Sequence, residues 1–577
     1  MDVVVLLDTV IKLVPLSSLH KVYPDFCPDN YGVGSFGAMR NETISFQFAY
    51  KLSSPKAHKC PFYIRVESEL PINTYSVGYV PVLHAEKLQD DEHRGPGLYP
   101  DMLLPKKHDA VIDDERDFWC HFQFERDEKN NLIAFNDCWQ SIWFTVNEDG
   151  ENLKAGKYTV TLKLYSRIGN KFMGQESVGI EIIDAELPRQ KLINTNWFHC
   201  DCLADIYNVE LFSDRFFEIY EDYIRKGVKN GMNMIFLPAF TPALDTSIGN
   251  ERMTVQLVKV ECNNGEYSFD FSLMKRYIDI SRRAGAEYFE HAHLFTQWGA
   301  TSAPKIMATV NGAEKRIFGW DTDATDKKYI DFLAEYIKAF SKFLKTEKLE
   351  NKILFHISDE PTPENSTGYT TAKKELGGLL EGYMCGDALS DYSFYESGMV
   401  PIPIVSITKV ESFYGRCDNL WCYYTGSSRK KKMSNRLIIN SSENNRIIGT
   451  QLYSYGIKGF LHWGYNYYYD MLSHGLFDPR TKTDGYYGRP GASYLVYPDN
   501  DGTAIQSIRQ KVFYEGINDM RALELLEKLC GRETADEVIK KHFGTLTFST
   551  LPENPEQLLA FRIEVNALID KAVTAKE

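Results

Sequence analysis

Alternation of apolar and polar positions marks the first third of the chain as β-rich. Five segments carry alternating or β-branched runs, and turn residues such as Asn73, Gly150 and Gly169 lie in the breaks between them. These segments are residues 43–50, 61–66, 141–146, 157–165 and 177–183. Several short strands at this spacing are typical of an antiparallel sandwich. We therefore expect residues 1–188 to form an N-terminal β-sandwich domain.

The pattern changes after Leu192, where strand-like apolar runs begin to alternate with amphipathic helical stretches. The eight strand candidates are residues 192–197, 233–237, 287–295, 353–358, 383–389, 402–407, 419–424 and 459–463. Eight βα units over about 250 residues or more predict a (β/α)8 barrel of the TIM type. A doubly wound sheet is the alternative, but no Gly-rich phosphate loop follows any candidate strand.

The barrel domain is expected over residues 189–500, and residues 501–577 form a helical C-terminal region that packs on it. The fold class is therefore multidomain, with an all-β domain followed by an α/β barrel. This division suits 577 residues, which exceed one ordinary core. Hydrophobic residues make up 43% and charged residues 25%, which excludes wholesale disorder and fibrous architectures.

Net charge and the absence of targeting signals limit the kinds of partner and the cellular compartment that we expect. The 79 acidic and 65 basic residues give a net charge of −14, which argues against a nucleic-acid partner. The apolar run after Asp2 is five residues long with no basic residue before it, so it is a poor signal peptide. No window reaches the 18 or so apolar residues of a membrane span. We expect no integral membrane segment and a cytoplasmic location, or secretion if a leader has been removed.

Two adjacent carboxylates follow the fourth candidate strand. Asp359 and Glu360 end this apolar run and are followed by Pro361. Active sites of barrels lie at the carboxyl ends of strands, and a proline biases the residue before it towards an extended backbone, so neighbouring side chains can diverge around one ligand. Close, partly desolvated carboxyls push their pKa values apart, giving one anion and one proton donor. An acidic turn or a helix cap is the alternative, but the position on the barrel favours a catalytic pair.

The histidines of the third candidate strand raise the question of a metal. His291 and His293 lie two residues apart in the predicted strand 287–295, so they share a face, as metal-binding pairs do. A full site needs further ligands from later strands, whose ends offer mostly Asp387, Tyr424 and Trp463. We therefore expect no metal, and expect His293 to hydrogen-bond a ligand instead.

Aromatic and polar residues gather at the ends of the candidate strands. An aromatic ring packs against the C–H face of a sugar, while Asn, His and Asp hydrogen-bond its hydroxyls. Each aromatic residue alone is more often part of a core, but their concentration where barrel loops converge favours a carbohydrate pocket. The predicted substrate-binding residues are Trp197, His199, His293, Trp298, Asp387, Tyr424, Trp463, Tyr465 and Asn466.

Short motifs in a fixed order resemble glycoside hydrolase family 123 over nearly the whole chain. They are Ser358 to Pro361, residues 421–426, Gly459 to Trp463, Ser507 to Arg509 with Glu515, Gly516 and Asp519, and the N-terminal Ser17 to Val22. The resemblance implies a β-sandwich followed by a (β/α)8 barrel, with Asp359 and Glu360 catalytic. It also implies exo-acting hydrolysis of β-linked N-acetylgalactosamine, without a cofactor, from oligosaccharides or glycolipid glycans like those of glycosphingolipids.

The adjacency of the pair favours substrate-assisted hydrolysis. Conventional glycosidases place two carboxyls on opposite sides of the bond, which neighbours on one strand end do not naturally do. If the 2-acetamido oxygen attacks the anomeric carbon, Asp359 holds the acetamido N–H and stabilises the oxazoline-like intermediate. Glu360 then serves as acid and later as base, and the product retains its configuration. Tyr424 is our candidate for binding the acetamido oxygen, and Trp463 for the floor under the ring.

Two other functions stay open. One is a carbohydrate-binding protein with a degenerate barrel, which the presence of both carboxylates disfavours. The other is a metal-dependent barrel hydrolase that uses His291 and His293. Sugar binding without turnover would indicate the first, and loss of activity with a chelator would indicate the second.

Overall fold

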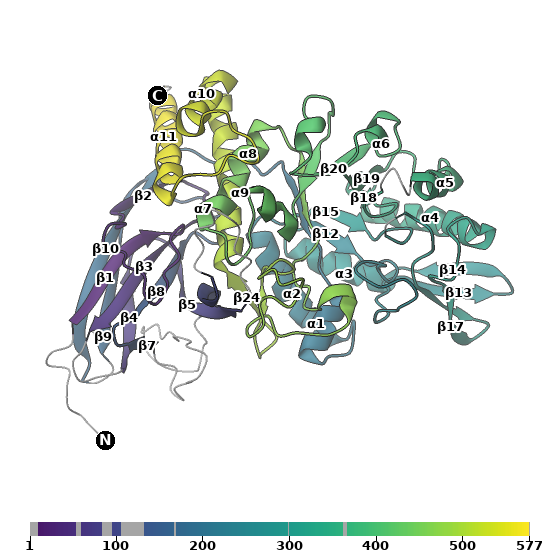
Figure 1. The fold of residues 1–577 in the computed structure, drawn as a ribbon, viewed down its shortest axis with the longest axis horizontal. Coiled ribbons are helices and arrows are strands. Elements are labelled where there is room, and N and C mark those ends of the chain that lie inside the picture. The colour runs from purple at the N-terminus through teal and green to yellow at the C-terminus, as the bar shows by residue number, and fades with distance from the viewer. Residues whose placement is uncertain are drawn as a thin grey trace.

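The order of domains follows the predicted one. The computed structural model has a β-rich N-terminal region, a closed eight-stranded parallel barrel and helices after it (Figure 1), which confirms the predicted fold class. The structure describes residues 10–53, 59–83, 95–105, 132–166, 169–297, 299–361 and 366–575.

The N-terminal region packs two sheets around side chains such as Phe46, Phe144 and Leu162. Its apolar positions alternate because one face of each sheet lies on this core. The larger sheet contains, in order, β1 (Val10–Ser17), β3 (Ile44–Ser53), β8 (Trp139–Val146), β5 (Ile72–Val82), β6 (Gly97–Pro105), β24 (Ala504–Ser507) and β23 (Tyr497–Pro498). The smaller contains β2 (Ser35–Met39), β10 (Lys171–Ile183), β9 (Gly156–Ser166), β4 (Lys59–Glu67) and β7 (Leu132–Phe135). Because β23 and β24 follow the barrel in sequence, the chain returns to the sandwich before its last helices.

Each of the eight predicted barrel segments contains one observed strand. The strands are β11 (Ile193–Asn196), β12 (Met234–Leu237), β15 (Tyr288–His291), β18 (Ile353–Phe355), β19 (Met384–Leu389), β20 (Ile402–Ser406), β21 (Trp421–Tyr423) and β22 (Gly459–His462). Parallel pairing of β11 with β22 closes the barrel. The carboxyl ends of all eight strands therefore meet at one mouth.

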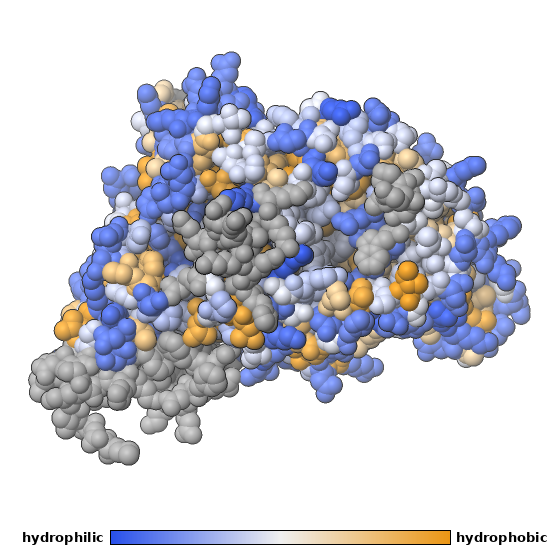
Figure 2. All heavy atoms as spheres, in the orientation of Figure 1, coloured by the Kyte–Doolittle hydropathy of each residue, from blue (hydrophilic) through white to orange (hydrophobic). Residues whose placement is uncertain are grey.

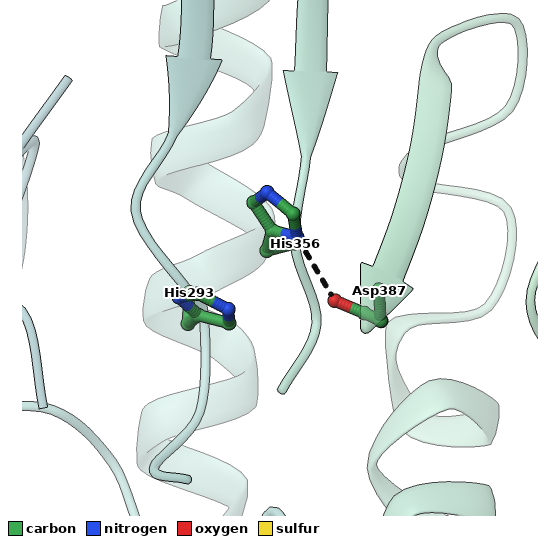
Figure 3. A group of neighbouring side chains, drawn as sticks. All are labelled: His293, His356 and Asp387. Atoms are coloured by element: carbon green, nitrogen blue, oxygen red, sulfur yellow. Dashed lines mark hydrogen bonds and ion pairs between the residues drawn. The ribbon is translucent and has the colours of Figure 1, made fainter. Parts of the chain in front are cut away.

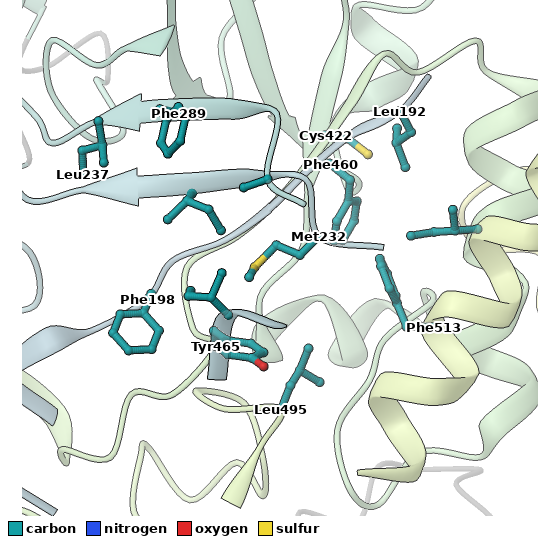
Figure 4. Close-up of a cluster of buried hydrophobic side chains, with 14 of the residues drawn as sticks. Leu192, Phe198, Met232, Leu237, Phe289, Cys422, Phe460, Tyr465, Leu495 and Phe513 are labelled. Carbon is teal, nitrogen blue, oxygen red and sulfur yellow. The ribbon is translucent and has the colours of Figure 1, made fainter. Parts of the chain in front are cut away.

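Side chains of the barrel strands alternate between two cores. Leu354, Trp421 and Leu461 pack inside the barrel. Their neighbours Cys422 and Phe460 belong to the outer core, where Figure 4 draws them beside Phe513 of α9 (Ile508–Cys530). This alternation decides which residues of a strand can reach the barrel interior.

The helices that cover the barrel are uneven in length. They are α1 (Cys200–Tyr207), α2 (Asp214–Lys229), α3 (Ser272–Arg283), α4 (Lys327–Glu347), α5 (Ser366–Leu376), α6 (Ser393–Glu396), α7 (Ser442–Arg446) and α8 (Ile448–Ser454). An additional sheet, not predicted from the sequence, is inserted after β12 and β15 in the order β14 (Glu266–Asp270), β13 (Lys259–Asn263), β16 (Ile306–Val310) and β17 (Ala313–Phe318). No helix within the described residues is long and apolar enough to cross a membrane.

Buried ion pairs join the sandwich, the barrel and the last helices, α9, α10 (Arg532–Phe543) and α11 (Pro555–Thr574). Arg446 of α7 contacts Asp519 at 2.7 Å and Glu515 at 3.0 Å, both on α9. Arg562 of α11 contacts Asp519 at 2.8 Å and Glu42 of the sandwich at 2.7 Å. We call these five residues the interdomain ionic network. In contrast to this buried polar junction, the outer face shown in Figure 2 has hydrophobic residues in patches among predominantly polar ones.

Candidate active site

The predicted catalytic pair lies just beyond β18, at the mouth of the barrel. Asp359 and Glu360 are both half-buried. Glu360 adopts a left-handed backbone conformation, with φ of +46°. The extended backbone predicted from Pro361 is therefore wrong, because the chain turns at Glu360 itself. A positive φ is sparsely populated for a residue with a Cβ, and backbone strain of this kind clusters at functional sites as well as in turns.

Glu360 is held from the opposite side of the barrel. The hydroxyl of Tyr423, at the end of β21, donates a hydrogen bond to Glu360 Oε1 at 2.7 Å. Tyr423 packs with the residues inside the barrel and is buried. A carboxylate from the fourth barrel strand is thus fixed by a side chain from the seventh.

The segment that carries the pair is paired beyond the end of its strand. Backbone N–H groups of Leu294 and Phe295 donate to the carbonyls of His356 and Ile357. The Ser358 hydroxyl also donates to the Thr296 carbonyl at 2.8 Å. These bonds extend the ladder between β15 and β18, so Asp359 follows a rigid backbone rather than a free loop.

A buried histidine lies between two carboxylates beneath the pair. Nε2 of His356 lies 2.5 Å from Glu290 Oε1, and its Nδ1 lies 3.2 Å from Asp387 Oδ1. All three side chains are buried. We call this group the Glu290–His356–Asp387 array. Of the three, Asp387 alone is a predicted site residue, although Glu290 stands out as a charged residue inside an apolar strand segment.

The remaining donors around the array all point at its carboxylates. Glu290 accepts from the Thr195 hydroxyl at 2.7 Å and from Trp197 Nε1 at 2.8 Å. Asp387 accepts from the Ile357 backbone N–H at 3.0 Å and from the Tyr369 hydroxyl at 2.6 Å. Both carboxylates are therefore surrounded by donors, as buried anions require.

The titratable groups at the mouth have pKa values that are shifted from their usual ranges. Burial and the neighbouring Glu360 carboxyl raise the pKa of Asp359 to about 8. Burial alone would lower the pKa of His356, but its bonds to Asp387 and Glu290 outweigh this and raise the pKa to about 10. These two pKa values favour the imidazolium form of His356 and one proton on the carboxyl pair near neutral pH.

Figure 3 shows His293, His356 and Asp387 together, and their ligand atoms lie within 4.8 Å of one another. The two imidazole rings are stacked, with centroids 4.6 Å apart and planes 21° apart. Lone pairs of ring nitrogens lie in the ring planes, so nearly parallel rings do not direct them at one ion. Both nitrogens of His356 already face carboxylates. This donor set does not fit a metal ion.

His291 does not join His293. Strand β15 ends at His291, so the predicted sharing of a face is wrong: His291 contacts the Ala292 carbonyl at 2.5 Å and the Tyr336 hydroxyl of α4 at 2.7 Å. Burial lowers the pKa of His291 to about 4. It belongs to the contact between barrel and helix.

Among the predicted aromatic residues, Trp197 and Trp463 stay near the mouth. Trp197 is buried inside the barrel, and its ring meets His293 edge to face at 5.4 Å. Trp463 is half-buried and packs against Tyr486 at 4.7 Å and Tyr467 at 5.3 Å. Trp298 lies outside the described residues.

The other predicted binding residues hold the loops of the site. Both ends of the Asn466 amide are bonded to the backbone of His199, whose Nε2 lies 2.8 Å from the Trp463 carbonyl. The Tyr465 hydroxyl donates to the Tyr223 carbonyl at 2.8 Å, in the outer core. These contacts join the segments after β11 and β22.

Tyr424 also faces away from the barrel interior. Its ring packs against Phe460 in the outer core, 5.1 Å between centroids. Since side chains alternate along β21, Tyr423 takes the inward position that the sequence analysis assigned to Tyr424. The alternation of Trp421 and Cys422 was the signal that could have separated the two tyrosines.

Comparison with known proteins identifies a family that this chain matches. The model of the glycoside hydrolase 123 catalytic domain matches residues 197–526. A family 123 glycoside hydrolase from Clostridium perfringens, studied for glycolipid glycan hydrolysis, superposes with a TM-score of 0.68 at 12% identity, over 98% of each chain. A Bacteroides uniformis β-glucuronidase reaches only 0.28 at 10% identity, over 81% of this chain and 48% of its own. No curated protein sequence matches the chain.

The family match spans more than half of the chain, and the full-length superposition agrees with it in fold. The matched residues include seven of the eight barrel strands, from β12 to β22, together with the carboxyl pair after β18 and most of α9. The protein belongs to glycoside hydrolase family 123 and is a glycosidase.

Proposed function

We propose that the protein is an exo-acting, retaining β-N-acetylgalactosaminidase. Its substrates are oligosaccharides or glycolipid glycans with a β-linked N-acetylgalactosamine at the non-reducing end. The observation that carries the proposal is the adjacency of Asp359 and Glu360 beyond one barrel strand. The glycolipid glycan hydrolysis studied in the similar Clostridium perfringens enzyme supports the substrate class.

In the proposed mechanism the substrate provides its own nucleophile. The 2-acetamido oxygen attacks the anomeric carbon and the glycosidic C–O bond breaks, while Glu360 gives its proton to the leaving oxygen. Asp359 accepts a hydrogen bond from the acetamido N–H and stabilises the positive charge of the oxazoline-like intermediate. Water, deprotonated by Glu360, then opens this ring. Two displacements at one carbon retain the configuration.

The proton shared by the pair suits these roles. The raised pKa of Asp359 means that the pair retains one proton near neutral pH. The hydrogen bond from Tyr423 fixes Glu360, so the acid is placed before substrate binds. As positive charge develops beside Asp359, the ionised form of Asp359 becomes favoured and the proton resides on Glu360.

Three measurements test the proposal together. Aryl β-N-acetylgalactosaminide should be cleaved, whereas the aryl β-galactoside, which lacks the acetamido group, should be nearly inert. A thiazoline analogue of N-acetylgalactosamine should bind far more tightly than the product sugar, because it mimics the cyclised intermediate. Mass spectrometry should find no glycosyl adduct. Efficient galactoside cleavage, or an adduct on Asp359, would show that the carboxylate is the nucleophile.

The sugar specificity is tested in the same assay. Aryl β-N-acetylglucosaminide, run beside the galactosaminide, differs from it only in the orientation of one hydroxyl. We expect the galactosaminide to have the higher kcat/KM. A preference for the glucosaminide would keep the mechanism and contradict the proposed substrate.

A further inference from the structure

We propose that His356 is a fixed imidazolium cation that positions the catalytic pair, and that its charge sets the pH range over which the pair keeps one proton. This inference rests on the proposed function, because it assigns His356 a role in the same acid–base chemistry. His356 acts through Asp359 and Glu360 and does not itself contact the reacting atoms.

The contacts of the His356 ring require two N–H groups. Each ring nitrogen of His356 faces a carboxylate oxygen, at 2.5 Å for Glu290 and 3.2 Å for Asp387. A neutral imidazole has one N–H and one lone pair, so in that form one nitrogen would direct its lone pair at an anion. Because each carboxylate also accepts bonds from other donors, both remain acceptors. Two N–H groups on His356 satisfy every contact in the array.

Asp387 connects the array to the catalytic pair. Asp387 accepts from the backbone N–H of Ile357 as well as facing His356. One carboxylate therefore fixes both the ring and the backbone two residues before Asp359. The cation of His356 lowers the pKa of Asp359, in opposition to burial and to Glu360. Geometry and charge act on the same short segment.

Other groups around His356 do not replace its charge. Within the part of the chain that the structure describes, the titratable groups that interact with it are Glu290 and His291 of β15, His293 of the loop that follows, Asp387 of β19 and Asp359 of its own segment. Burial lowers the pKa of His291 to about 4, so its ring is neutral. Burial lowers the pKa of His293 well below its usual range, so its stacked ring is neutral. The hydroxyl of Tyr369 on α5 faces Asp387. Glu290 and Asp387 each accept hydrogen bonds from several donors, so the positive charge of this group is that of His356.

The state of His356 can be measured without substrate. In full-length protein labelled with ¹⁵N-histidine, the ring nitrogens of His356, assigned by comparison with His356→Gln, should keep imidazolium shifts up to about pH 9. Histidine ordinarily titrates near pH 6.5. Neutral-imidazole shifts at pH 8 would overturn the proposal.

The pH profile tests the effect on the pair. The alkaline limb of kcat/KM should lie near pH 8 in the native enzyme, because the acid is lost when the pair gives up its last proton. In His356→Gln the limb should move up by about one pH unit, since a neighbouring cation has been removed. His291→Gln is the matched control, a buried histidine of the same region that contacts Tyr336 instead. An unmoved limb in His356→Gln, or an equal shift in both variants, would overturn the proposal.

These two measurements test the role of His356 separately from the proposed function. The profile is measured with whichever aryl glycoside the enzyme cleaves, so a different sugar preference contradicts the proposed substrate and leaves the test of His356 intact. Conversely, efficient cleavage of the galactosaminide with a neutral His356 retains the function and rejects the cation.

Discussion

Two buried groups of charges in this molecule differ in their balance. The interdomain ionic network sets two arginines against three carboxylates, and each arginine contacts two of them. At the barrel mouth, the one imidazolium of His356 lies among four carboxyl groups, Glu290, Asp387, Asp359 and Glu360. Nearly balanced charges suit a structural junction. Excess negative charge retains a proton and favours a positively charged intermediate, which is what hydrolysis through an oxazoline requires.

The comparison predicts that changes at the mouth affect the reaction. Glu360→Gln should reduce turnover of an unactivated glycan by roughly 10²- to 10⁴-fold, because the acid–base group is lost. Aryl glycosides with activated leaving groups should lose less, since they need little protonation. Steady-state kinetics on both substrates measure the effect, and thermal unfolding of the variant should stay close to that of the native protein. Near-normal turnover of the natural glycan would contradict the role of Glu360.

Changes in the interdomain ionic network should affect stability instead. Arg446→Met leaves Asp519 and Glu515 with one fewer buried partner, and breaking such a pair destabilises proteins by about 3–5 kcal/mol. The free energy of unfolding in urea measures this loss. The folded fraction should retain its kcat, because the carboxylates that Arg446 contacts are those of Glu515 and Asp519 on α9 and not those of the catalytic pair. A loss of kcat in fully folded protein would break the comparison.

Two neighbouring tyrosines allow a more specific test of the contacts at the barrel mouth. Tyr423→Phe removes the donor to Glu360, and hydrogen bonds to charged groups contribute about 1.5–3 kcal/mol, so kcat/KM should fall by roughly 10- to 100-fold. Tyr424→Phe is the matched control. Its hydroxyl is buried without a hydrogen-bond partner within the described residues, so its removal should leave kcat/KM nearly unchanged. Equal losses in both variants would show that the inward position of Tyr423 does not matter.

The tyrosines also show how far the sequence could predict the molecule. All eight barrel strands were located, because buried parallel strands carry short apolar runs that alternate with helices. The position of Asp359 and Glu360 followed from that order. The side on which Tyr424 or His291 projects did not follow, since it depends on where a strand ends and on its alternation, and both change with a shift of one residue.

Contacts between segments that are distant in the sequence were also not predicted. The Glu290–His356–Asp387 array joins three barrel segments. Their order in the barrel was predictable, but the contacts between their side chains were not. The return of β23 and β24 to the sandwich also lacked a signal, because two short strands after a barrel resemble loops in sequence. The inserted sheet of β13, β14, β16 and β17 was not predicted either.

The smallest expected effect concerns a metal at the mouth. Prolonged dialysis against a strong chelator should leave kcat/KM unchanged, because the stacked rings of His293 and His356 do not direct their nitrogens at a common point. Both nitrogens of His356 are already within reach of carboxylates, so a metal ion would have to displace a bond of the array. The control is the chelated enzyme assayed with and without added zinc. Activity that disappears on dialysis and returns with zinc would mean that the array rearranges around an ion, and that the excess of carboxylates is there to hold a metal rather than to stabilise charge on the sugar.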